Sequence, residues 1–108
     1  MSENDSVKLP AHIKVLGKKF KVKDLTSEND EGFEDCEGYM DYRSQEIAVR
    51  TDVGLGYSQD TLLHEVIHAV EESLDLRFTE KQVFQLAAGL LGVLKENKEF
   101  TDWLLQNE

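Results

Sequence analysis

The chain is poor in cysteine and has no long apolar run. Its one cysteine, Cys36, cannot form a disulfide within the chain, so a reducing compartment is the simpler expectation. No apolar stretch approaches the roughly 20 residues that a membrane-spanning helix needs. Residues 1–5 lack the basic start and the apolar segment of a secretory signal peptide. These features predict a cytoplasmic protein that does not associate with a membrane.

Positive charge is also scarce. The chain has 12 Lys and Arg residues against 22 Asp and Glu residues, which gives a formal net charge of −10. Binding to a nucleic-acid backbone or to an anionic membrane surface requires clustered basic side chains, so neither is expected. The acidic balance leaves open a basic protein partner, or an inhibitor that imitates nucleic acid.

Proline occurs once, at Pro10, just before the first patterned segment. A length of 108 residues is typical of one domain with a modest core. Residues 1–9 are polar and acidic and are expected to be disordered. The sequence therefore predicts a single domain over residues 10–108.

Two segments alternate apolar and polar residues, which is typical of half-buried strands. Residues 12–23 contain a tight-turn signal at Gly17-Lys18, and residues 38–50 contain one at Arg43-Ser44. Each segment predicts a β-hairpin, and together they predict a short twisted sheet.

The apolar period then changes from two to that of a helix. A first helix is expected to begin near Ser58 or Asp60 and to end between residues 74 and 77. Thr79 is the expected N-cap of a second helix. That helix carries an apolar stripe, and a short packing segment follows it. The stripe comprises Val83, Leu86, Ala87, Leu90, Val93 and Leu94, and the packing segment comprises Phe100, Trp103 and Leu104. The fold class predicted is α+β, with a sheet followed by two packed helices.

Residues 64–68 read His-Glu-Val-Ile-His and match the H-E-x-x-H motif inside the first predicted helix. Residues four apart are neighbours on a helix surface, so the imidazoles of His64 and His68 can converge on one cation. Glu65 borders that position and is the expected catalytic base. In zinc hydrolases of this kind the metal activates a water molecule, and the glutamate transfers a proton to the leaving amine.

A catalytic zinc ion needs a third protein ligand and one open position. Glu80 is favoured, because two helices packed through their apolar stripes would direct it at the His pair. Asp75 in the turn between the helices is the alternative, and a site without a third ligand is the other. Glu71 shares a helix sector with the His pair and fits better as a hydrogen-bond partner for an imidazole N–H.

The order of these segments resembles a known group of proteins. Two short hairpins are followed by residues 61–69, Thr-Leu-Leu-His-Glu-Val-Ile-His-Ala, and by residues 83–90, Val-Phe-Gln-Leu-Ala-Ala-Gly-Leu. Over residues 11–97 the chain is similar to small zincin-like proteins of bacteriophages and prophages, related to the ImmA/IrrE-type metallopeptidases and the minigluzincins. The motif of residues 64–68 is the specific part of this resemblance.

The resemblance implies a zincin-like core and a zinc ion held by His64, His68 and Glu80. It implies limited cleavage of a specific protein substrate, in the host cytoplasm for a phage protein. It further implies that a strand at residues 45–50 lies at the sheet edge and binds substrate by strand addition. The alternative is a catalytically inactive zinc-binding scaffold that acts as an acidic protein-interaction module or inhibitor.

The second predicted helix departs from the pattern of the relatives at two positions. Related sequences often carry further glutamates in the first turns of the second helix, where this chain has Gln82 and Phe84. A metal-binding glutamate of the relatives that aligned with either position would have no counterpart here, whereas Glu80 carries over as the third ligand.

Overall fold

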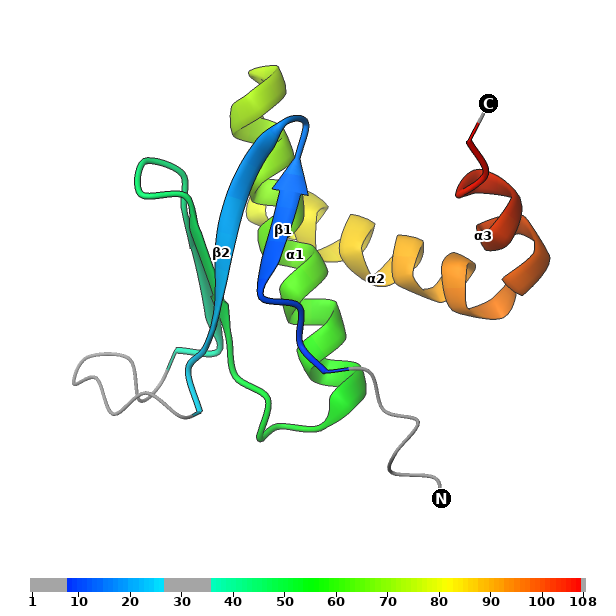
Figure 1. Ribbon diagram of the computed structural model, residues 1–108, viewed down its shortest axis with the longest axis horizontal. Helices are drawn as coiled ribbons and strands as arrows, with labels where there is room; N and C mark the ends of the chain where they lie inside the picture. Colours follow the sequence, from blue (N-terminus) through cyan, green and yellow to red (C-terminus); the bar gives the residue numbers. More distant parts are fainter. Residues whose placement is uncertain (1–7, 27–35, 108) are drawn as a thin grey trace.

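A mixed four-stranded sheet and three helices make up the computed structural model, which describes residues 8–26 and 36–107 (Figure 1). The sequence predicts disorder for residues 1–9. Of these, residues 1–7 lie outside the described residues. The elements in chain order are β1 (His12–Val15), β2 (Lys18–Asp24), β3 (Gly38–Asp41), β4 (Glu46–Val49), α1 (Leu55–Leu74), α2 (Glu80–Glu96) and α3 (Lys98–Leu104). The predicted α+β class and both hairpins are confirmed.

The strand order is β1-β2-β4-β3, and this order corrects one expectation. Residues 45–50 were expected at the sheet edge, but β4 pairs in parallel with β2 and antiparallel with β3. The side chains of Ile47, Ala48 and Val49 are all fully buried, as in an interior strand covered on both faces. The edge strand on this side of the sheet is β3.

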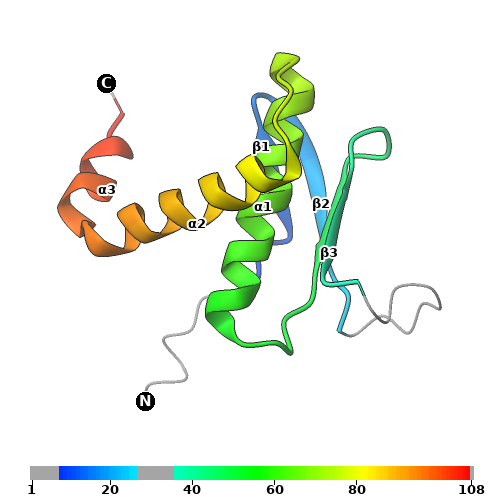
Figure 2. The same ribbon diagram turned by 180° about the vertical axis from the view of Figure 1, so that it is seen from behind.

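Helix α1 packs across one face of the sheet (Figure 2). The main core lies between them and contains Val15, Phe20, Ile47 and Ala69. The helix begins at Leu55, one turn before the predicted start, because the Ser58 hydroxyl donates to the Arg50 carbonyl instead of capping the helix. That bond fixes the start of α1 to the end of β4.

A five-residue turn, residues 75–79, leads from α1 to α2. The predicted cap is confirmed: the Thr79 hydroxyl accepts from the Gln82 backbone N–H, and the Gln82 side chain accepts from the Thr79 N–H. This reciprocal capping box fixes the first turn of α2. A second, smaller core forms where α2 crosses α1, between Ile67, Val83 and Ala87.

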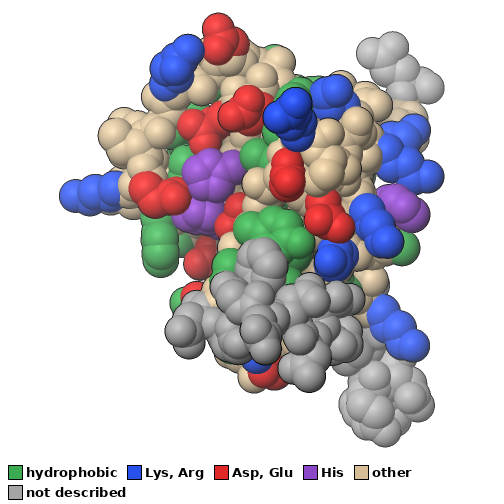
Figure 3. Space-filling view, turned by 90° about the vertical axis from the view of Figure 1, so that its left-hand side faces the viewer, with side chains coloured by type: hydrophobic (Ala, Val, Ile, Leu, Met, Phe, Trp, Pro, Cys, Tyr) green, Lys and Arg blue, Asp and Glu red, His purple; other side chains and the backbone are tan. Residues whose placement is uncertain are grey.

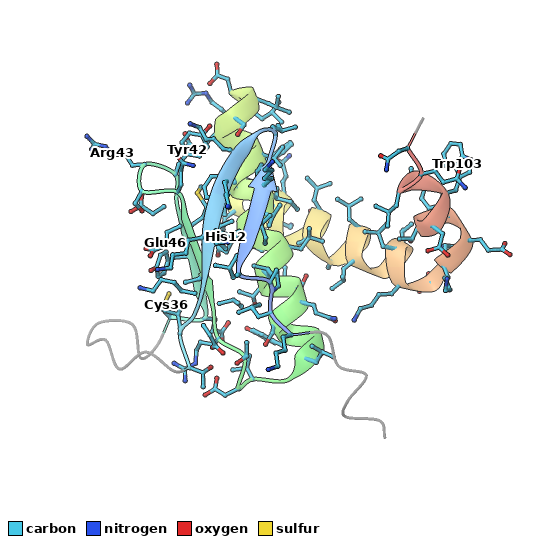
Figure 4. The ribbon with its side chains drawn as sticks, viewed as in Figure 1. His12, Cys36, Tyr42, Arg43, Glu46 and Trp103 are labelled. Atoms are coloured by element: carbon cyan, nitrogen blue, oxygen red, sulfur yellow. The ribbon has the colours of Figure 1, made fainter. Side chains whose placement is uncertain are left out.

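The rest of α2 extends away from the sheet and carries α3 at its end (Figures 1 and 4). Leu86, Leu90 and Val93 are between 38% and 47% exposed, so only part of the predicted stripe is buried. The expected packing of the C-terminal segment is wrong, since Trp103 is 65% exposed and α3 contacts α2 alone among the described helices and strands. Helix α3 is seven residues long, follows a non-helical Asn97 and has no buried residue, so it adds nothing to the core.

Two valines of α2 give a matched test of this arrangement. Val83→Ala is expected to lower the free energy of unfolding by about 2 kcal/mol, because it removes two methyl groups from a fully buried site. Val93→Ala removes the same groups from a side chain that is 45% exposed and is expected to change it by less than about 0.5 kcal/mol. Urea denaturation measures both, and equal losses would contradict the described packing of α2.

No helix in the described part of the chain combines the length and the apolar character needed to cross a bilayer.

Candidate metal centre

Helix α1 brings the two motif histidines together on adjacent turns. The rings of His64 and His68 lie with their centroids 4.9 Å apart in an edge-to-face arrangement. Their side chains are 17% and 28% exposed, so each ring is held by the fold while one edge remains accessible. Figure 3 shows the histidine pair on the surface with Asp and Glu side chains gathered around it.

The first residue of α2 completes the cluster. Glu80 Oε1 lies 3.0 Å from His64 Nε2 and 3.0 Å from His68 Nε2. One nitrogen of each ring and this carboxylate oxygen all lie within 4.8 Å of one another. The structure thus brings Glu80 to the His pair, whereas Asp75, whose side chain is 90% exposed, faces Arg77.

The donor set suits a zinc ion. Ligands at 2.0–2.1 Å in a tetrahedral site are separated from one another by about 3.3 Å, close to the two observed separations of 3.0 Å. Two imidazole nitrogens and one carboxylate oxygen are the types of ligand that catalytic zinc sites use. The Glu80 side chain is 72% exposed, so the side of the cluster that faces solvent is open.

Glu71 fixes the orientation of the His68 ring, as its helix sector predicted. Glu71 Oε1 lies 2.8 Å from His68 Nδ1, and Oε2 accepts the Phe78 backbone N–H at 2.8 Å. Because a carboxylate only accepts, the ring proton lies on Nδ1 and a neutral His68 presents a lone pair at Nε2. In that form of the ring, His68 Nε2 and Glu80 Oε1, 3.0 Å apart, can both act as electron-pair donors to one cation.

The side chain of Glu65, on α1, faces the edge strand β3: its Cγ would lie 3.6 Å from a Cβ placed on Gly38. Burial raises the pKa of Glu65 above its usual range; the charges of His64 and His68 lower it, and that of Glu80 raises it again. A raised pKa makes this carboxylate a stronger base than an exposed glutamate. The fold allows this proximity because Gly38 has no side chain: a Cβ there would lie 2.7 Å from Thr61 Cγ2 and 2.9 Å from the Ala48 carbonyl oxygen.

Two pockets flank the cluster along β3. The first, of about 210 Å³, includes Gly38 and is called the Gly38 pocket. The second, of about 330 Å³, includes Met40 and is called the Met40 pocket. The Gly38 pocket is lined by Glu37, Gly38, Tyr57, Asp60, Thr61, His64, Glu65 and Phe84, and the Met40 pocket by Met40, Glu65, His68, Glu71, Glu72, Leu76 and Phe78.

Sequence reasoning missed the residues that β3 and α2 contribute to these pockets. Phe84 lies edge-on to the His64 ring, with the centroids 5.9 Å apart, and it follows Glu80 by one helical turn. That spacing is the signal that could have found it, because residues four apart share a helix face. Gly38 and Met40 could not have been found without knowing which strand forms the edge. His12, which lies on β1 (Figure 4), is not among the described residues that form the cluster.

Comparison of the chain with protein-family models, curated proteins and solved structures found no match.

Proposed function

We propose that this protein is a zinc-dependent, zincin-like metallopeptidase that cleaves a specific protein substrate in the cytoplasm. The observation that carries the proposal is the meeting of His64 Nε2, His68 Nε2 and Glu80 Oε1 from two helices. The H-E-x-x-H spacing on α1, the open side of the cluster and the position of Glu65 support it further.

The residues have separate roles in this reaction. His64, His68 and Glu80 would hold the zinc ion, which would supply Lewis-acid chemistry at this site. Glu65 would accept a proton from the attacking water and donate it to the departing amine, which would restore the carboxylate. Glu71 keeps the His68 proton on Nδ1 and so leaves Nε2 free to bind metal.

Substrate binding is assigned to the edge of β3, in place of the interior strand β4. Among the described strands β3 pairs only with β4, so its other edge can accept an added strand. At that edge the Gly38 carbonyl accepts from the Cys36 thiol at 3.1 Å, a weak bond that a backbone N–H of the added strand would replace. Gly38 and Met40 alternate along β3 and line the two pockets on either side of Glu65. An extended peptide paired with β3 therefore passes the cluster and can place one side chain in each pocket.

Chelation and restoration of zinc test the proposal. Protein incubated with zinc is expected to hydrolyse members of a fluorogenic peptide library, to lose this activity with 1,10-phenanthroline, and to regain it when zinc is added. Zinc uptake without any hydrolysis would leave the alternative function, a zinc-binding scaffold that engages a protein partner. Failure to take up zinc would contradict both functions.

Glu71 gives a prediction on metal affinity. Glu71→Gln removes the anionic acceptor of the His68 Nδ1–H and is expected to weaken zinc binding about 10- to 100-fold. Competition against a chromogenic chelator measures the affinity. Glu72→Gln is the matched control, since Glu72 is exposed and it is Glu71, not Glu72, that bonds to His68. Equal affinity in the two variants would contradict the role given to Glu71.

A further inference from the structure

The Gly38 pocket carries negative charge, although Arg50, whose guanidinium binds Asp52, also lies within electrostatic reach of Glu37. Glu37 and Asp60 each contribute a carboxylate, and none of the residues that line the pocket is lysine or arginine. The pocket adjoins His64 and Glu65, so a side chain inside it lies next to the proposed reaction centre.

One oxygen of Asp60 is left without a partner. Asp60 Oδ1 exposes less than 1 Å² to solvent and forms no hydrogen bond with any described residue. A buried carboxylate oxygen without a donor costs free energy, and a charged donor relieves that cost better than a neutral one. The negative charge of a carboxylate is shared by its two oxygens, so a cation in the pocket that Asp60 lines stabilises the whole group, the shielded Oδ1 included.

Glu37 and Phe84 complete a site for a long basic side chain. The Tyr57 hydroxyl donates to Glu37 Oε1 and thereby orients that carboxylate at the pocket. Phe84 is 59% exposed and offers an apolar wall. The alkyl stem of a lysine or arginine can pack on such a ring while its charged end reaches the carboxylates.

The Met40 pocket lacks this unsatisfied charge. Both oxygens of its inner carboxylate, Glu71, are engaged by His68 and by the Phe78 N–H. Met40, Leu76 and Phe78 form the rest of its wall, with the exposed Glu72 at its rim. The two sides of the metal cluster therefore differ in the side chain that they accept.

We infer that the Gly38 pocket selects substrates with a lysine or arginine next to the bond that is cut. This inference rests on the proposed function, in which a peptide lies along β3 across the metal cluster. Asp60 and Glu37 are the residues that determine the specificity, through charge-assisted hydrogen bonds to the basic side chain.

Paired hydroxamates test the inference by binding alone. A hydroxamate group anchors each probe at zinc, and the probe carries either a lysine or a norleucine side chain, placed on one or the other side of that group. Calorimetry with the zinc-loaded protein is expected to show about 10-fold tighter binding of the lysine probe in one of the two placements. Asp60→Asn and Glu37→Gln are expected to bring that ratio towards one, and Glu72→Gln, in the Met40 pocket, to leave it unchanged.

The outcomes separate the inference from the proposed function. Equal binding of lysine and norleucine probes in both placements, or a ratio that survives Asp60→Asn, overturns the inference, even if the protein hydrolyses peptides. A lysine preference that depends on Asp60 supports the inference, even if no hydrolysis occurs and the proposed reaction fails. Binding of neither probe overturns both. Circular dichroism of each variant establishes that it is folded, and the norleucine probe reports whether its zinc site is intact.

Discussion

Replacing Glu65 with glutamine is expected to lower kcat/KM for peptide hydrolysis by about 10²- to 10⁴-fold, the range that a positioned general base contributes. Glutamine has the same shape but cannot accept the proton. Glu65 is not one of the three residues that meet at the cluster, so the variant is expected to bind one equivalent of zinc like the wild type. Steady-state kinetics on a fluorogenic peptide and metal analysis of the same sample measure the two effects.

Control variants make this result specific. Glu96→Gln removes an exposed carboxylate at the end of α2, outside both pockets, and is expected to keep full activity. A Glu65→Gln protein that still hydrolyses peptide at the wild-type rate would contradict the assignment of the base. A variant that loses zinc would show that Glu65 supports the metal instead of the reaction.

Replacing Glu80 with alanine is expected to have the second largest effect, on metal content. Wild-type protein purified without chelators should contain about one equivalent of zinc, and Glu80→Ala below about a tenth, because a catalytic site requires three protein ligands. Glu80 Oε1 is the one oxygen that lies 3.0 Å from both histidine nitrogens. Inductively coupled plasma mass spectrometry measures the zinc content.

Asp75→Ala is the matched control for Glu80→Ala, since it removes the carboxylate that competed for the same role. Its side chain points to Arg77, so zinc content is expected to stay near one equivalent. Loss of zinc in Asp75→Ala together with retention in Glu80→Ala would reverse the assignment of the third ligand.

The sequence predicted the local features of this fold well. Both hairpins, the Thr79 cap and the helical position of the H-E-x-x-H motif follow from short-range patterns, and these are confirmed. The position of Glu80 beside the His pair was also predicted, because Glu80 opens a helix that was expected to pack on the first helix through its apolar stripe. The side-chain partner of His68, Glu71, lies three residues away on the same helix and is likewise a local feature.

Long-range pairing could not be predicted in the same way. The alternation of residues 45–50 is compatible with an edge or an interior strand, and the parallel contact with β2 decides between them. Gly38 has its role only because that contact places β3 at the edge, against Thr61 and Glu65. Similarly, the apolar stripe of α2 does not reveal how much of it α1 will cover, and Leu90 and Val93 prove to be outside the contact.

The parallel pairing of β2 with β4 has a consequence for how the protein folds. Each hairpin joins residues close in sequence and can form early at a small entropic cost, whereas Val22 meets Ile47 only after a long loop has closed. We therefore expect the two hairpins to form quickly and the β2–β4 pairing that joins them to form slowly. Helix α1 packs on β1 on one side of the β2–β4 pairing and on β3 and β4 on the other. We therefore expect the sheet to assemble in the same late step in which the helix that carries the histidines docks.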